Sequence, residues 1–172
     1  MIGLPLKEEA HKIVKDLIET ELYKQHLYMY LSLCASNVGF YDARRWFYEK
    51  SNDQSCSVRN LLSMLEKRGI KEPLPSVDQI TGDYSSLKAA FQEAYDCEVE
   101  SIVELQKAVR KLLDIDVLAF SELLNFLSSN KWSIERLHDL INVFSAAESK
   151  EDELELESKE FGCHDNAPVT QG

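Results

Sequence analysis

Glycine and proline are scarce in this sequence, whose 172 residues include six glycines and four prolines. Three of the prolines, Pro5, Pro73 and Pro75, lie outside the segments in which apolar residues recur at helical spacing. Proline inside a helix removes a hydrogen bond and clashes with the preceding turn, so this distribution favours long, uninterrupted helices. A chain of this length can bury most of its apolar surface in one domain. The sequence therefore predicts an all-α domain.

Long apolar runs and paired cysteines are also missing. No window approaches the about 20 apolar residues that cross a bilayer, and residues 1–7 lack the pattern of a secretory signal. These features predict a cytoplasmic protein without a membrane segment. The four cysteines, Cys34, Cys56, Cys97 and Cys163, form no Cys-x-x-Cys pair. We therefore expect buried or incidental thiols instead of a zinc site or a disulfide framework.

Basic residues are outnumbered, since 19 Lys and Arg stand against 30 Asp and Glu, a net charge of −11. Residues 148–172 hold eight acidic and two basic residues, a net charge of −6, which leaves −5 for residues 1–147. This balance disfavours nucleic acid as a partner and is compatible with attraction of metal cations.

Apolar residues at spacings of three and four predict four long helices. They cover residues 8–36, 42–68, 84–113 and 117–146. Asp42 is suited to cap the second helix and Gly69 to end it. Residues 70–84 are too long for a tight hairpin and could span about 50 Å when extended, enough to run the length of a bundle. The pattern predicts a four-helix bundle with one long crossover between helices two and three.

Four segments resemble successive helices of the ferritin family. They are Glu19 to Ser32, with its Glu-Leu-Tyr triplet and a later tyrosine, Trp46 to Gly69, Phe91 to Glu98, and Phe120 to Lys131. The resemblance covers about residues 8–146 and implies a ferritin-like bundle in residues 1–147. Residues 148–172 would then be an acidic C-terminal tail or a short fifth helix. The repelling charges favour the solvated tail.

The resemblance also indicates where a metal centre would lie. Di-iron bundles of this kind place carboxylates and histidines from facing helices at one level. Glu21 and Glu98 occupy ligand positions, and Tyr28 matches the tyrosine beside the iron pair. The Glu-x-x-His motif of helix two is absent, because Gln54 and Ser57 stand in its place. Glu21, Glu98 and Gln54 therefore form at most a residual metal site.

Lys131 stands where helix four of the family offers Gln or Glu. A charged ammonium has three donors and no lone pair, so it cannot bind iron. We expect Lys131 to lie beside Glu21 and Glu98 and to neutralise them in place of metal. Tyr28, Ser57 and Lys131 are thus predicted to border the centre. Two literal Glu-x-x-His strings, ending at His11 and His138, diverge toward opposite ends of the bundle and are interpreted as chance matches.

The resemblance implies a subunit of an iron-storage cage, with a homo-oligomeric 24-mer favoured and iron held weakly or as ferric mineral. The missing ligands imply little or no ferroxidase activity, so the chain is interpreted as a structural subunit rather than an enzyme. Co-assembly with ferroxidase-competent subunits would suit that role. Two alternatives stay open: a weakly active ferroxidase at the residual site, and a metal-free scaffold or interaction protein with the same fold.

Overall fold

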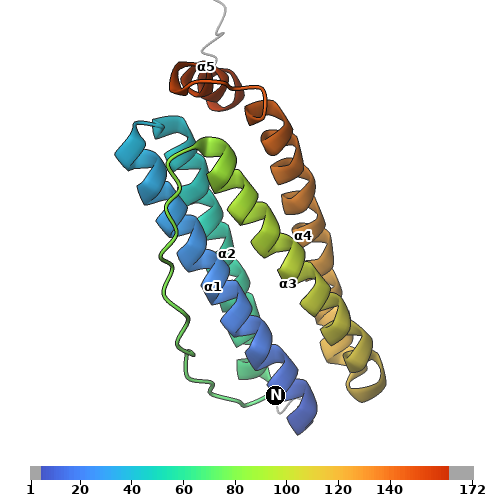
Figure 1. The fold of residues 1–172 in the computed structure, drawn as a ribbon. Helices are drawn as coiled ribbons and strands as arrows, with labels where there is room; N and C mark the ends of the chain where they lie inside the picture. The colour runs from blue at the N-terminus through green and yellow to red at the C-terminus, as the bar shows by residue number, and fades with distance from the viewer. Residues whose placement is uncertain (1–4, 163–172) are drawn as a thin grey trace, which may run out of the picture.

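The computed structural model describes residues 5–162, which fold into five helices. These are α1 (Glu8–Val38), α2 (Tyr41–Lys67), α3 (Leu87–Ile115), α4 (Val117–Phe144) and α5 (Lys150–Phe161). The first four form an elongated bundle, and α5 lies across one end of it (Figure 1). The all-α bundle predicted from the sequence is confirmed. None of the described helices is long and apolar enough to cross a membrane.

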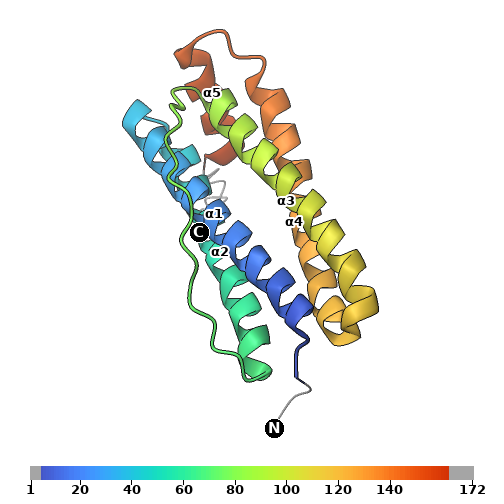
Figure 2. The same ribbon diagram turned by 60° about the horizontal axis from the view of Figure 1, so that its bottom comes forward.

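The crossover between α2 and α3 sets the topology. It runs alongside the bundle from the end of α2 to the opposite end, where α3 begins, so α2 and α3 are parallel (Figures 1 and 2). Near its start, Glu72 contacts His11 Nε2 at 2.6 Å and Lys15 Nζ at 3.2 Å. Near its end, the Tyr30 hydroxyl donates to the Gly82 carbonyl at 2.8 Å. The crossover is therefore fastened to α1 at both ends of the bundle.

Local signals explain where α1 and α2 end. Gly39 follows α1 with φ of +96°, and its N–H donates to the Ala35 carbonyl at 3.1 Å. Gly69 has φ of +77° and ends α2 as predicted. Both positions lie in the left-handed region that glycine enters without a Cβ penalty. The predicted cap Asp42 was wrong, because α2 begins at Tyr41 and Asp42 lies inside its first turn.

The acids of α5 provide the cap that Asp42 does not. Glu157 Oε1 accepts the Ala43 N–H of α2 at 2.8 Å, and Glu153 Oε1 accepts the Leu87 N–H of α3 at 2.9 Å. Both carboxylates are buried and lie at helix N-termini, where negative charge is stabilised. The favoured solvated tail is therefore wrong for residues 150–161. Residues 163–172, including Cys163, lie outside the described residues.

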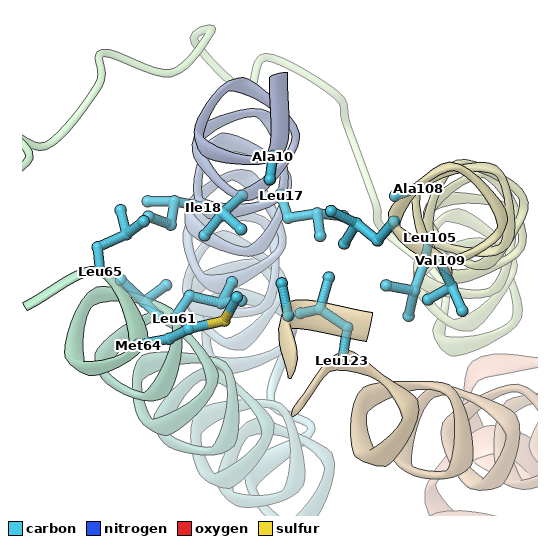
Figure 3. Close-up of a cluster of buried hydrophobic side chains, with 14 of the residues drawn as sticks. Ala10, Leu17, Ile18, Leu61, Met64, Leu65, Leu105, Ala108, Val109 and Leu123 are labelled. Atoms are coloured by element: carbon cyan, nitrogen blue, oxygen red, sulfur yellow. The ribbon is translucent and has the colours of Figure 1, made fainter. Parts of the chain in front are cut away.

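The core consists of two apolar clusters separated by a polar layer. One cluster fills the end of the bundle near the α3–α4 turn with side chains from all four helices (Figure 3). The other lies near α5 and includes rings from four helices and α5, among them Phe47, Phe91, Phe144 and Phe161. Between the clusters lie buried polar residues from all four bundle helices: Glu21, Lys24, Ser51, Gln54, Glu98, Ser101 and Asn130. That layer is the candidate site.

Candidate metal centre

The polar layer receives side chains from each of the four bundle helices. α1 supplies Glu21 and Lys24, α2 supplies Gln54, α3 supplies Glu98 and α4 supplies Asn130. Lys24 and Glu98 are 0% exposed, so the layer is closed to solvent at its centre. Buried charges persist only where partners compensate for lost hydration, so the contacts among these groups decide what the site can do.

Lys24 forms the centre of this layer. Its Nζ lies 2.9 Å from Glu98 Oε2 and 3.1 Å from Glu21 Oε1. It also donates to Asn130 Oδ1 at 2.9 Å. The ammonium therefore has hydrogen bonds to Glu21 and Asn130 and a close ion pair with Glu98, so groups from three helices compensate its charge. The lysine thus links α1, α3 and α4 inside the bundle.

Glu98 has a partner at each carboxylate oxygen. The Tyr28 hydroxyl donates to Glu98 Oε1 at 2.8 Å, while Oε2 faces the Lys24 ammonium. Tyr28 is buried and packs against Trp46 and Phe47, with ring centroids 6.4 Å apart in each pair. Tyr28 therefore lies beside Glu98, and its hydroxyl supports the carboxylate.

The charges of the layer shift one another's protonation. Burial alone would lower the pKa of Lys24, but the charges of Glu98 and Glu21 outweigh burial and raise it. Burial raises the pKa of Glu21, with the Lys24 charge opposing and the Glu98 charge adding to the effect. Burial and Glu98 raise the pKa of Tyr28 well above its usual range. These directions describe a charged lysine and a tyrosine that retains its proton.

On α2, neither expected motif position supplies a strong metal ligand. Gln54 is buried, and its Oε1 has no hydrogen-bond partner within the described part of the chain. Ser57 is half-buried, and its hydroxyl donates to the Asp53 carbonyl of its own helix at 3.4 Å. A neutral amide and a hydroxyl supply no charge to compensate a cation. This side of the layer is therefore neutral.

The predicted position of Lys131 was wrong. Its side chain is 71% exposed and lies 3.6 Å from Glu135 on its own helix. The buried stripe of α4 follows Leu123, Asn130, Leu137 and Phe144, a spacing of seven that places Asn130 inside. Residue 131 is turned about 100° away from that stripe. The neutralising lysine of the layer comes instead from α1.

Sequence reasoning missed Lys24, although its spacing carried a signal. Lys24 lies three residues after Glu21 and four before Tyr28. Residues three and four apart share a helix face, so two inward-facing residues should have placed Lys24 between them. Asn130 was missed because the family resemblance placed its neighbour Lys131 at the ligand position of helix four.

The residues of the layer do not fit a pair of iron ions. The Lys24 ammonium lies within 3.1 Å of both carboxylates that would have to bridge the metals. Glu21, Glu98 and Gln54 do lie in one layer, but no histidine joins them. Across residues 5–162, no group of three or more His, Cys, Asp or Glu side chains is arranged to hold a metal ion. His11 and His138 lie apart, one at Glu72 and the other near Asn142.

A family model and a curated relative both point to the same protein family. Residues 12–147 match the family model for ferritin, described as a ferritin-like domain. A probable bacterial non-heme ferritin-like protein of Haemophilus influenzae is 24% identical over 142 residues, which cover 82% of each chain.

Solved structures give the same fold. An open pore ferritin from the archaeon Archaeoglobus fulgidus superposes with a TM-score of 0.86 at 18% identity, covering 93% of this chain and 99% of that one. A second structure of that ferritin gives a TM-score of 0.84 at 17% identity, covering 89% and 96% of the two chains.

Proposed function

Because the chain belongs to the ferritin family, we propose that it is an iron-storage subunit without ferroxidase activity. In this proposal a salt bridge closes the interior of the bundle to metal. Iron is the cargo of the assembly in this proposal. The subunit contributes to the shell and to storage of ferric mineral, and Fe(II) oxidation is left to solution chemistry or to competent partner subunits.

The observation that carries the proposal is the position of the Lys24 ammonium between Glu21 and Glu98. A divalent ion at the same place would have to displace a buried cation that already has three polar partners. The lysine would then be left charged and buried beside the metal, which costs several kcal/mol. Metal binding between these carboxylates is therefore disfavoured in the folded protein.

Rapid mixing of the purified protein with Fe(II) in air tests the catalytic part. We expect slow oxidation without a fast, saturable phase. The same experiment on a Glu98→Ala variant should give an indistinguishable time course. A fast phase that saturates at a fixed iron-to-subunit ratio and disappears in Glu98→Ala would favour the weakly active ferroxidase instead.

Assembly and storage need a separate experiment. Light scattering coupled to size-exclusion chromatography should give a closed shell, with a 24-mer as the expected size. Iron staining of the same fraction should be positive after loading with Fe(II). A small dimer that stays free of iron would overturn the storage role and favour a scaffold or interaction protein.

A further inference from the structure

A cleft of about 440 Å³ lies between α2 and α4, on the outer side of the polar layer. Gln54 and Asn130, which belong to that layer, line the cleft together with Lys50, Arg136 and three serines. The cleft is separate from the contacts of Lys24 with the two carboxylates, and none of the storage chemistry proposed above uses it. Its lining is unusual for a chain with a net charge of −11.

Two cations lie toward the same end of this cleft. The helices α2 and α4 run in opposite directions. Lys50 is the first lining residue of α2 and Arg136 is the last lining residue of α4, so both lie toward the same end of the cleft. Their side chains are partly buried, with 26% and 42% exposed. The one carboxylate of the lining is Asp53, which is 67% exposed and lies 3.5 Å from Lys50. Partly buried charges are screened less than fully exposed ones.

Arg136 is oriented by α5. Its Nη2 lies 3.3 Å from Glu160 Oε2, and its guanidinium lies 6.0 Å from the Phe161 ring. A guanidinium carries five N–H donors, so one contact with Glu160 leaves donors for a ligand. Glu160 does not line the cleft. The pairing therefore positions the arginine and reduces its charge only in part.

The two amides add neutral donors. Gln54 Oε1 is enclosed, and Asn130 Oδ1 accepts a hydrogen bond from Lys24. The polar groups that these residues can offer to the cleft are therefore their amide nitrogens, which donate. The hydroxyls of Ser57 and Ser129 already donate to carbonyls of their own helices. Two cations, two amides and the Ser133 hydroxyl therefore supply the donors of the cleft, and such a set is matched by a ligand rich in acceptors.

We propose that the α2–α4 cleft binds a small multivalent oxyanion, such as phosphate or a polycarboxylate. Its charge is directed to Lys50 and Arg136, and its remaining oxygens face the two amides and Ser133. The cleft is larger than one phosphate needs, so a polycarboxylate would also fit. Phosphate and citrate therefore serve as separate probes of the two kinds of oxyanion.

Calorimetric titration of the full-length protein at constant ionic strength tests this binding, with inorganic phosphate and citrate as separate probes. We expect saturable binding of at least one of them. Lys50→Gln should weaken it about tenfold, because the variant removes a charge-assisted hydrogen bond to the ligand. Asp53→Asn should strengthen it, because the variant removes the carboxylate of the lining and the partner of Lys50.

Two variants on α3 control for net charge. Lys107→Gln and Glu104→Gln make the same charge changes at an exposed ion pair that does not line the cleft. Both should bind the probe as the parent does. The proposal is overturned if neither probe binds saturably at millimolar concentration, or if each α3 variant changes affinity as much as its α2 counterpart. Circular dichroism confirms that each variant is folded.

Discussion

At the scale of single residues, Lys24 decides what the interior of the bundle can hold. It is buried completely and neutralises part of the charge of two buried carboxylates. The layer still carries two acids against one base. Proton uptake by Glu21, whose pKa is raised by burial, would remove the remaining charge.

Replacing Lys24 with methionine should destabilise the protein strongly. The variant keeps the volume of the side chain but leaves Glu21 and Glu98 without their cation. Removal of one partner of a buried ion pair costs about 3 kcal/mol or more. Urea unfolding at neutral pH measures the loss. Lys131→Met is the matched control, because its side chain is exposed and surface substitutions usually change stability by less than about 0.5 kcal/mol.

Adding Glu98→Gln to Lys24→Met keeps the test informative if the single variant unfolds. The double variant has one buried charge fewer, so it should recover part of the lost stability. Equal stability of Lys24→Met and Lys131→Met would show that the buried ion pair contributes nothing.

Loss of the ammonium should also open the layer to metal. In Lys24→Ala the two carboxylates face a space without a cation, together with Gln54 and Asn130. An ion that binds only the folded state raises its stability. Added Mn²⁺ should therefore raise the melting temperature of Lys24→Ala more than that of the parent. The effect should disappear in Lys24→Ala with Glu98→Gln, and an equal rise in all three proteins would contradict the assignment.

At the scale of elements, α5 acts as a cap for two other helices. Its acidic residues repel one another, which favoured a tail from sequence alone. Two of them, Glu153 and Glu157, accept backbone N–H groups at the N-termini of α3 and α2. Those partners lie 66 and 114 residues away, so no local pattern revealed them. The four bundle helices were predictable because their apolar spacing is local.

Removal of either capping carboxylate should destabilise the bundle. Glu153→Ala leaves the Leu87 N–H without its acceptor, and Glu157→Ala does the same to Ala43. Loss of a helix cap typically costs about 1 kcal/mol. Glu155→Ala is the control on the same helix, because Glu155 is exposed and its one ion pair among the described residues is with Lys159. Thermal unfolding should rank Glu155→Ala near the parent, and the same loss in all three would exclude a specific cap.

At the scale of the whole molecule, the sequence predicted the bundle and the crossover better than it predicted the site. The fold depends on many apolar positions, so an error of one residue in α4 left the topology intact. The same error exchanged Asn130 for Lys131 and assigned the neutralising charge to the wrong helix. A site depends on a few side chains whose register must be known to the residue.

Stability of the whole molecule should fall in alkaline solution. Burial, with the charge of Glu98, raises the pKa of the Cys97 thiol to about 12, from a usual 9.0. Burial likewise raises the pKa of Tyr84 to about 12. Between the usual and the raised pKa the unfolded chain binds fewer protons than the folded one. The free energy of unfolding therefore decreases as the pH rises through this window, and the raised pKa of Lys24 acts in the same direction.

Cys97 supplies the measurable part of this alkaline effect. Urea unfolding between pH 9 and pH 11, with a reducing agent present, measures the free energy of unfolding. This free energy should decrease less per pH unit in Cys97→Ala than in the parent, because the variant lacks the thiol that releases its proton on unfolding. Cys56→Ala is the matched control, since the Cys56 thiol is exposed in the folded protein. Its decrease should equal that of the parent. An identical decrease in all three proteins would mean that the Cys97 thiol titrates alike in the folded and unfolded chains.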